Sequence, residues 1–316
     1  MKCLVTGVAG LVGTNLALAL SRSGWEVLGY DNFSNPSGFL EKTIPVIEND
    51  IRDACALQSA MEGVDAVIHL AAAGSVVESV ADPWSNFEQN VRGSLCVFEA
   101  ARVARVPKVI YASTGGALMG NTHPPVSELS LPKPISPYGA SKLAVEAYAS
   151  AYAESFGVNT LGLRFANVYG ECLLHKKGII TRWFRAVANK EPITIFGDGS
   201  ASRDYLYVGD LVEGIVSALQ HQFTGSEVFH LASGEETSLS ELAELMTRVT
   251  GSTDLEVVFQ PKRSGEVERN FASYEKANRI LNFEPKVKFE QGLKITWEWF
   301  RENSKSVQDI NIIGYK

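Results

Sequence analysis

The stretch "VTGVAGLVGTNLALAL", residues 5–20, decides the fold. Its glycines Gly7, Gly10 and Gly13 recur every three residues, after a short apolar run and at the start of a segment rich in alanine and leucine. In such a strand–turn–helix unit the first glycine permits the tight turn, the second lets a pyrophosphate approach the backbone, and the third lets helix and strand pack closely. The phosphate then faces the helix N-terminus, where we expect Leu11 and Val12 to lie. An ordinary strand-to-helix turn could carry the same glycines. Other parts of the chain are needed to distinguish it from a dinucleotide-binding turn.

Short apolar runs alternate with longer helical patterns up to about residue 170, and a mixture of short strands and helices follows. Runs that are apolar on both faces and separated by helices are typical of a parallel sheet wound on both sides. The sequence therefore predicts a Rossmann-like doubly wound α/β fold with a smaller C-terminal α/β lobe. We expect the dinucleotide-binding domain to span 1–169, with return segments around 203–232, and the lobe to comprise 170–202 and 233–316. The predicted strands lie in "KCLVTG", "EVLGYDN", "IPVIEND", "DAVIHLAA", "KVIYAST" and "NTLGLRFANVYG".

Composition limits the classes of function. The 316 residues carry a formal net charge of −7, and the Lys and Arg residues are scattered, which argues against a nucleic-acid partner. Four cysteines without a CxxC pair or metal spacing predict reduced thiols in a cytoplasmic protein and no metal site. The start "MKCLVTG" is unlike a secretory signal, and no window approaches the roughly 18 apolar residues of a membrane span.

Carboxylates end two predicted strands where a dinucleotide would lie. Asp31 follows Gly7 by 24 residues, a position from which a carboxylate accepts hydrogen bonds from an adenosine ribose. The same carboxylate would repel a 2′-phosphate, so the sequence favours NAD over NADP. Asp50 and Ile51 end the third strand, at the expected adenine position.

The fourth predicted strand ends in "HLAA", residues 69–72. The small residues Ala71, Ala72 and Ala73 would let the backbone lie close to the cofactor, and we expect cofactor contacts at Leu70, Ala71 and Ala72. We interpret His69 as a packed strand residue rather than a ligand.

Tyr138 and Lys142 lie four residues apart in "SPYGASKLAVEAYASAYAESFG" and so share one face of a predicted helix. An ammonium beside a phenol favours the phenolate, so we expect the pKa of Tyr138 to lie below its usual value of about 10. A tyrosine tuned in this way can act as a general base at neutral pH. A solvated Tyr–Lys pair on the helix surface is the alternative.

Taken together, the motifs resemble those of the extended short-chain dehydrogenase/reductase family, and within it the nucleotide-sugar 4-epimerases of the UDP-glucose/UDP-N-acetylglucosamine type. The motifs, in chain order, are "TGVAGLVG", "DN" at Asp31, "NVRGSLCVFEAAR", "ST" in "YASTGGALMG", "YGASK", "RFANVYG", "GDGSASRDYLYVGD" and "RSGE" at 263–266. The resemblance covers almost the whole chain. It implies NAD as the cofactor, a UDP-sugar as the substrate, and further cofactor contacts from Asn32, Asn90 and Phe165.

The resemblance also implies a hydroxyl beside Tyr138. In this family the strand that leads into the "STGG" turn presents a Ser or Thr hydroxyl to the tyrosine and to the sugar O4. Ser113 and Thr114 both have a suitable spacing, and we favour Thr114. Met119 stands where relatives often carry tyrosine, a departure that concerns loop packing more than chemistry.

For the nucleotide sugar, the resemblance places Asn167 near the diphosphate, Arg203 and Arg263 on its oxygens, and Glu266 on the uridine ribose. Forked guanidinium groups match phosphate, and carboxylates match paired hydroxyls. Charged surface side chains are the alternative for the two arginines. The further substrate-binding residues implied are Phe196, as a wall for uracil, Ile180 and Thr194.

The reaction implied by the resemblance is C4 epimerisation through a transient 4-keto sugar. Tyr138 would remove the O4 proton, with Thr114 or Ser113 relaying it, while Lys142 would tune the tyrosine and hold the nicotinamide ribose. Dehydratases of this family carry an acid pair after the threonine, and here two glycines follow Thr114. A nucleotide-sugar 4-reductase and a non-enzymatic nucleotide-sensing protein are the alternatives. Two helix patterns, at 82–103 and 138–156, resemble the pair that forms a homodimer contact in the family.

Asn270 is the last predicted site residue. It stands seven residues after Arg263, where the resemblance implies a gate beside the sugar's C2 substituent: a tyrosine there restricts relatives to plain hexoses, and a small residue admits N-acetyl groups. Asparagine is much smaller than tyrosine and brings an amide that can bond an acetamido oxygen. The alternative is that Asn270 only starts the strand "NFASY". We expect the enzyme to accept UDP-N-acetylhexosamines.

Overall fold

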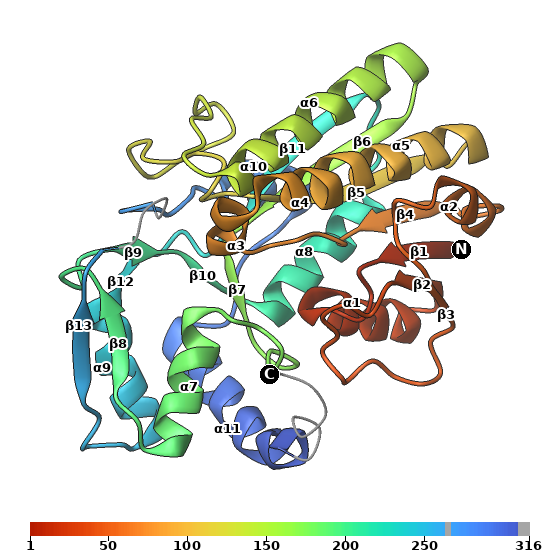
Figure 1. Ribbon diagram of the computed structural model, residues 1–316. Coiled ribbons are helices and arrows are strands. Elements are labelled where there is room, and N and C mark those ends of the chain that lie inside the picture. Colours follow the sequence, from red (N-terminus) through yellow and green to blue (C-terminus); the bar gives the residue numbers. More distant parts are fainter. Residues whose placement is uncertain (263–266, 309–316) are drawn as a thin grey trace.

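The computed structural model describes residues 1–262 and 267–308, without the side chains of 305–308. A seven-stranded parallel sheet forms its centre, in the order β11-β6-β5-β4-β1-β2-β3 (Figure 1). The order reverses between β1 and β4, the position at which open α/β sheets bind ligands beyond the strands' carboxyl ends. The strands are β1 (Lys2–Thr6), β2 (Glu26–Asp31), β3 (Val46–Glu48), β4 (Ala66–His69), β5 (Lys108–Thr114), β6 (Asn159–Phe165) and β11 (Ser226–Leu231). The predicted Rossmann-like α/β fold is confirmed.

Helices cover both faces of the sheet (Figure 1). Leu16 and Leu211 belong to the core on one face, and Phe98 and Val145 to the core on the other. Burial on both faces explains why the strands read as continuous apolar runs. The helices are α1 (Leu11–Arg22) and α8 (Val208–Gln220) on the first face, and α2 (Ala54–Ala60), α5 (Gly93–Ala104) and α6 (Pro137–Phe156) on the second.

A smaller group of elements lies to one side of the sheet (Figure 1). It contains the parallel pair β8 (Ile193–Phe196) and β13 (Val257–Gln260), with α7 (Ile179–Asn189), α9 (Leu239–Thr250) and α11 (Phe289–Gln308). Two short pairs join the regions, β7 (Asn167–Tyr169) with β10 (Tyr205–Tyr207), and β9 (Ser202–Arg203) with β12 (Thr237–Ser238). The remaining helices are α3 (Val76–Ala81), α4 (Pro83–Phe87), the π-helix η1 (Glu88–Arg92) and α10 (Glu275–Leu281). The division of the chain into two domains at the stated residues stays a prediction.

The run "NTLGLRFANVYG" forms two strands, so its prediction as one strand is wrong. The N–H of Ala166 donates to the carbonyl of Leu231 at 3.0 Å, and the next N–H, of Asn167, donates to the carbonyl of Asp204 at 2.9 Å. The chain therefore leaves the main sheet after β6 and pairs with β10 instead. The apolar pattern continues across this change of partner, so periodicity could not locate it.

Asp204 joins several segments at this point. Its buried carboxylate accepts hydrogen bonds from the N–H and hydroxyl of Ser233, at 2.9 and 2.7 Å, and from the N–H groups of Gly234 at 3.1 Å and Ala272 at 3.4 Å. Burial raises the pKa of this carboxyl, and the donors oppose that rise. One side chain thus links β10 to the end of β11 and to the segment that carries Asn270.

No helix within 1–262 and 267–308 has the length and apolar character needed to span a membrane.

Candidate active site

The glycine turn between β1 and α1 is closely packed at Gly7 and Gly13 and open at Gly10. A Cβ at Gly7 would lie 2.5 Å from the nitrogen of Ala71, and one at Gly13 would overlap the carbonyl oxygen of Gly7. Beside Gly10 the nearest atom to such a Cβ is 3.4 Å away, so the backbone there is accessible. No side chain caps the first turn of α1, whose N–H groups stay available to an anion. This turn fits a dinucleotide pyrophosphate.

Asp31 lies beside that turn at the end of β2. One carboxylate oxygen accepts a hydrogen bond from the N–H of Ala9 at 2.9 Å, and the other from the N–H of Phe33 at 2.8 Å. Each oxygen retains a second lone pair that a ribose hydroxyl can use. The carboxylate is therefore held where the sequence predicts the ribose contact.

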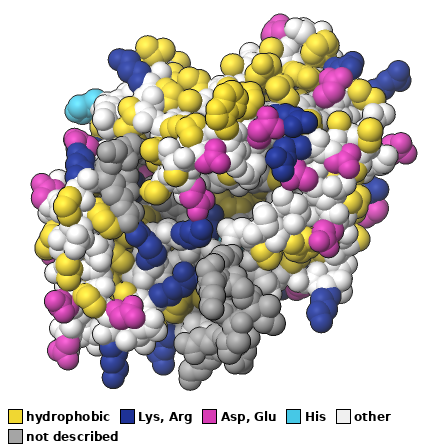
Figure 2. All heavy atoms as spheres, in the orientation of Figure 1, with side chains coloured by type: hydrophobic (Ala, Val, Ile, Leu, Met, Phe, Trp, Pro, Cys, Tyr) yellow, Lys and Arg dark blue, Asp and Glu magenta, His cyan; other side chains and the backbone are white. Residues whose placement is uncertain are grey.

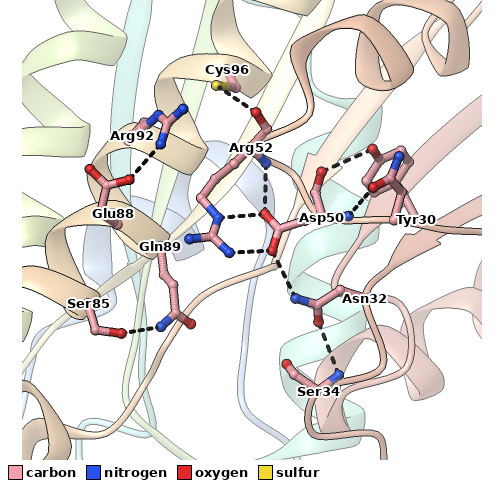
Figure 3. A network of polar contacts seen from close by, with 11 residues as sticks. Tyr30, Asn32, Ser34, Asp50, Arg52, Ser85, Glu88, Gln89, Arg92 and Cys96 are labelled. Atoms are coloured by element: carbon pink, nitrogen blue, oxygen red, sulfur yellow. Dashed lines mark hydrogen bonds and ion pairs between the residues drawn. The ribbon is translucent and has the colours of Figure 1, made fainter.

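Asp50, the predicted adenine contact, is fully engaged within the chain (Figure 3). Its carboxylate accepts from Nε and Nη2 of Arg52, each at 2.8 Å, from the Arg52 N–H at 2.9 Å, and from Nδ2 of Asn32 at 3.2 Å. The Arg52 guanidinium holds the pKa of Asp50 well below its usual value. Because four donors use its acceptor sites, Asp50 would have to give up one of them to bind an adenine amino group. Ile51 beside it is buried.

His69 and Asn90 stabilise the chain around the β4 end. The ring of His69 contacts Thr6 Oγ1 at 2.7 Å and Ser94 Oγ at 2.9 Å, and burial lowers its pKa to about 3, as expected for a packed strand residue. The buried amide of Asn90 accepts from the N–H of Ala73 at 2.8 Å and donates to its carbonyl at 3.1 Å. Asn90 thus fixes the loop after "HLAA", and a direct contact of its side chain with a cofactor stays a prediction. The other predicted cofactor residues on this side, Leu70, Ala71, Ala72 and Phe165, are partly or fully exposed.

Tyr138 and Lys142 meet the end of β5. Helix α6 begins at Pro137 because the hydroxyl of Ser136 caps it by accepting from the N–H of Gly139 at 3.2 Å, and this places Tyr138 in the first turn. The side chain of Tyr138 is hydrogen-bonded to that of Thr114. Lys142 is 4% exposed and donates to the carbonyl of Ala112 at 2.9 Å. The alternative of a solvated surface pair is therefore wrong.

Ser113 does not share this site, so the hypothesis that it relays the proton is wrong. It is buried, and its hydroxyl donates to Oε1 of Glu146 at 2.6 Å. The Ser113 hydroxyl thus meets α6 two turns beyond Tyr138, and the hydroxyl that contacts the tyrosine is that of Thr114.

The prediction that the pKa of Tyr138 lies below its usual value is also wrong. Burial raises the pKa of Tyr138 to about 12, and the hydrogen bond from Thr114 opposes the rise. The ammonium of Lys142 is committed to the Ala112 carbonyl. Burial lowers the pKa of Lys142 to about 8, while the nearby Glu146 charge raises it. For both Tyr138 and Lys142, the loss of hydration on burial thus has a larger effect on the pKa than the expected attraction between the two side chains.

The predicted substrate residues are only partly brought together. Asn167 is exposed and donates to the carbonyl of Asp204 at 3.1 Å. Arg203, in β9, donates to the carbonyl of Ser202 at 2.7 Å. Thr194 and Phe196 are partly buried in β8. Ile180 is only 4% exposed and belongs to the core, so its prediction as a substrate contact is wrong: it lies on the buried face of the amphipathic helix α7. Arg263 and Glu266 lie outside the described residues.

Asn270 lies against the glycines that follow Thr114. Its Nδ2 donates to the carbonyl of Gly115 at 3.4 Å, and its Oδ1 lies 3.1 Å from where a Cβ on Gly116 would stand. A segment far along the chain therefore reaches the turn next to the proposed catalytic hydroxyl. Met119, at the edge of this turn, is fully buried with Leu118 and Val126, so its departure affects packing.

The sequence interpretation missed one charged group close to the site. Glu146 continues the four-residue spacing of Tyr138 and Lys142, which is a signal that the sequence does contain. Its partner Arg164 comes from β6, and no local pattern connects the two. Lys and Arg side chains also gather near the middle of one face of the molecule (Figure 2). A further cationic contact was not predicted either: Lys177, in the loop before α7, donates to Glu78 of α3 at 2.8 Å.

Comparison with known proteins identifies the family to which this chain belongs. The sequence model of the NAD dependent epimerase/dehydratase family matches residues 3–232. The chain belongs to this family. The match confirms the family expected from the motifs and the expected use of NAD, which the glycine turn and Asp31 fit.

Relatives within the NAD dependent epimerase/dehydratase family differ in the sugar that their names state. The UDP-glucuronate 4-epimerase of Thermodesulfobacterium geofontis is 31% identical over 98% of this chain and 99% of its own. A crystal structure of the Thermotoga maritima UDP-glucose 4-epimerase with UDP-glucose has a TM-score of 0.92 at 35% identity, covering 96% of this chain and all of that one. The UDP-N-acetylglucosamine 4-epimerase of Methanobrevibacter ruminantium, in complex with UDP-N-acetylmuramic acid, has a TM-score of 0.89 at 29% identity, covering 96% of this chain and 98% of that one.

The first prediction concerns the preference between cofactors. We expect the purified protein to bind NAD in preference to NADP, because the Asp31 carboxylate lies at the predicted ribose position and repels a 2′-phosphate. Calorimetric titration with each nucleotide, and identification of the nucleotide released on denaturation, measure this preference. Release of mainly NADP would contradict the role of Asp31.

Proposed function

We propose that the protein interconverts the C4 epimers of a UDP-sugar, with Tyr138 as the base that takes the O4 proton. The observation that carries the proposal is the arrangement at the end of β5: a Tyr138–Thr114 hydrogen bond with the buried Lys142 one helical turn away. The likeness over almost the full chain to 4-epimerases of three UDP-sugars supports this reaction.

NAD, when bound, supplies the acceptor and later the donor of the C4 hydride. The residues proposed to hold it are those of the glycine turn with Asp31 at one end, and Tyr138 and Lys142 at the other. The chain's own task is to move the O4 proton. Thr114 donates or accepts at the phenol, and Lys142 supplies positive charge next to it. Burial raises the pKa of Tyr138 to about 12, so its ionisation near neutral pH needs a positive charge beside the phenol, and we propose that the Lys142 ammonium, bonded here to the Ala112 carbonyl, supplies it.

For the substrate, we propose that Asn167 and Arg203 contact the diphosphate, with Thr194 and Phe196 near the nucleoside. Arg263 and Glu266 keep their proposed roles on the diphosphate and on the ribose. A guanidinium can bind two phosphate oxygens at once, which suits Arg203 to this task.

Incubation of the protein with UDP-hexoses, UDP-N-acetylhexosamines and UDP-hexuronic acids, with NMR of the products, tests the proposal. We expect inversion at C4 without added cofactor, since an epimerase returns the hydride that it takes. A product reduced at C4 that forms only with added NADH would support the 4-reductase instead. No turnover of any sugar, with tight binding of UDP-sugars, would support the sensor.

We further propose that N-acetylated sugars are substrates. Asn270 lies beside Gly115 and Gly116, so its side chain borders the turn that carries Thr114. Its Nδ2 carries two hydrogens and uses one on the Gly115 carbonyl, which leaves one for an acetamido oxygen.

We also propose that the protein is a homodimer through α4 and α6. Trp84 is 78% exposed and Phe87 46% exposed on α4, beside an apolar groove that reaches Ala140 and Ala144 of α6. Large exposed aromatic side chains next to a groove are typical of an interface.

The second prediction follows from this surface. We expect light scattering during size-exclusion chromatography to give twice the chain mass of 34.4 kDa. Trp84→Glu, which puts a charge into the contact, should yield the monomer, while Phe259→Glu at a 56% exposed position of β13 should not. A monomeric parent protein at micromolar concentration would contradict the dimer.

A further inference from the structure

Helix α6 carries a third side chain on the face that holds Tyr138 and Lys142. Glu146 follows Lys142 by four residues, so all three side chains lie along one stripe. This stripe meets three consecutive residues of β5, in the pairs Tyr138 with Thr114, Lys142 with the carbonyl of Ala112, and Glu146 with Ser113. The strand end that bears the proposed proton relay is thus held by the same helix at three points.

Glu146 is buried and forms an ion pair with Arg164. Nε of Arg164 donates to its Oε1 at 2.9 Å, and Nη2 donates to its Oε2 at 2.7 Å, with both side chains under 10% exposed. On the far side, Nη1 of Arg164 contacts Nε2 of His230 at 3.4 Å, and burial lowers the pKa of His230 to about 3. His230 is therefore neutral, and the charges in this cluster are those of Glu146 and Arg164.

Stability alone does not account for this ion pair. Two charges lose their hydration when they are buried, and apolar residues of similar volume often replace such a pair without loss of stability. A role in the neighbouring site is the alternative, because Glu146 lies one helical turn from Lys142.

We propose that Glu146 is a positioning residue that keeps the Lys142 ammonium charged and, through Ser113, holds the end of β5 that carries Thr114. The catalytic significance of this role rests on the proposed function. The electrostatic effect of Glu146 on Lys142 does not.

Among the groups around Lys142, the Glu146 carboxylate is the one that favours the charged form of the lysine. Burial lowers the pKa of Lys142 to about 8, and the Glu146 carboxylate is what opposes this decrease. Removal of that carboxylate would take the ammonium towards neutrality near pH 7. Other titratable groups on α6 and on the elements around it include Tyr138 on α6, His69 on β4, Tyr111 on β5, Arg164 on β6 and His230 on β11. Those on the helices packed against α6 include Glu78 on α3, Glu88 and Arg92 on η1, and Glu99 and Arg102 on α5, all of which form ion pairs at exposed positions. Neither histidine is protonated at neutral pH, because burial lowers the pKa of each to about 3.

The third prediction is a lower pKa of Lys142 when Glu146 is neutral. The chain is labelled with ¹³C-lysine, and the Cε resonance of Lys142, assigned through Lys142→Arg, is followed against pH. We expect a midpoint at about 8 in the parent protein and a midpoint lower by about one unit or more in Glu146→Gln. Glu146→Asp, which keeps the charge, should lie between them. The alkaline limb of the pH profile of kcat should move in the same direction.

Two further variants separate the proposal from a loss of folding. Glu146→Leu with Arg164→Met removes both charges, avoids an unpaired buried guanidinium, and should still lower the midpoint. Glu154→Gln makes the same chemical change on an exposed position of α6 and should leave the midpoint unchanged. An unchanged midpoint in the folded double variant would overturn the proposal. A shifted midpoint in a protein that epimerises no sugar would uphold this electrostatic role and reject the proposed function.

Discussion

Tyr138→Phe is expected to reduce kcat by about 10²–10⁴-fold, the range that the loss of a general acid–base group typically produces. The substitution removes only the hydroxyl that Thr114 contacts, and the ring and the helix cap at Ser136 stay in place. Binding of NAD and of UDP should therefore change little. Turnover of UDP-sugars by NMR, and calorimetric titration with NAD and with UDP, measure the two effects separately.

Tyr148→Phe is the matched control for this variant. Tyr148 lies on the same helix and is 43% exposed, so removal of its hydroxyl should leave turnover within twofold. If Tyr138→Phe retained activity within about tenfold of the parent protein, the assignment of Tyr138 as the base would be wrong.

Asn270→Tyr is expected to abolish turnover of N-acetylated UDP-sugars selectively. Asn270 is 3% exposed and lies against Gly115 and Gly116, so a phenol ring has no room on the side of the turn and must extend to where we place the C2 substituent. A clash of this kind can cost several kcal/mol, or more than a hundredfold in kcat/KM. UDP-glucose, which carries a hydroxyl at C2, should be spared.

Activity on UDP-glucose serves as the internal control for Asn270→Tyr. Thermal unfolding and NAD titration show whether the variant folds, because a ring forced against Gly116 could displace the turn. Equal loss on both substrates in a folded protein would show that Asn270 supports the turn and does not select the sugar. No loss on either would place the C2 substituent elsewhere.

Local sequence patterns were sufficient for much of the fold and for part of the candidate site. The glycine turn, Asp31, Tyr138 and Lys142 are each recognisable within a few residues, because strand, turn and helix impose short periods on the sequence. Ser113 and Thr114 could not be separated in this way. The choice between them depends on which side chain of α6 each hydroxyl meets: Ser113 bonds to Glu146, 33 positions along the chain, and Thr114 meets Tyr138.

The sequence could not predict the direction of the Tyr138 pKa shift, for a related reason. The spacing of Tyr138 and Lys142 indicates that they are neighbours, but it does not indicate how completely both are buried. Burial proves the larger effect on each. Ile180 is the opposite case, since the amphipathic pattern of α7 already indicates a core position, and the resemblance alone suggested a ligand contact.

Asp204 limits how this chain can be recombined with its relatives. The stretch that matches the family, residues 3–232, stops just before Ser233 and Gly234, which together with Ala272 supply the donors for the Asp204 carboxylate. A chimaera that joins this stretch to the remainder of another protein inherits a buried carboxylate whose donors come from the foreign part. Where that part offers a different loop, the carboxylate loses hydrogen bonds at a cost of about 1–3 kcal/mol or more. A junction at residue 232 therefore separates Asp204 from its donors. A functional chimaera has to keep Asp204 together with Ser233, Gly234 and Ala272.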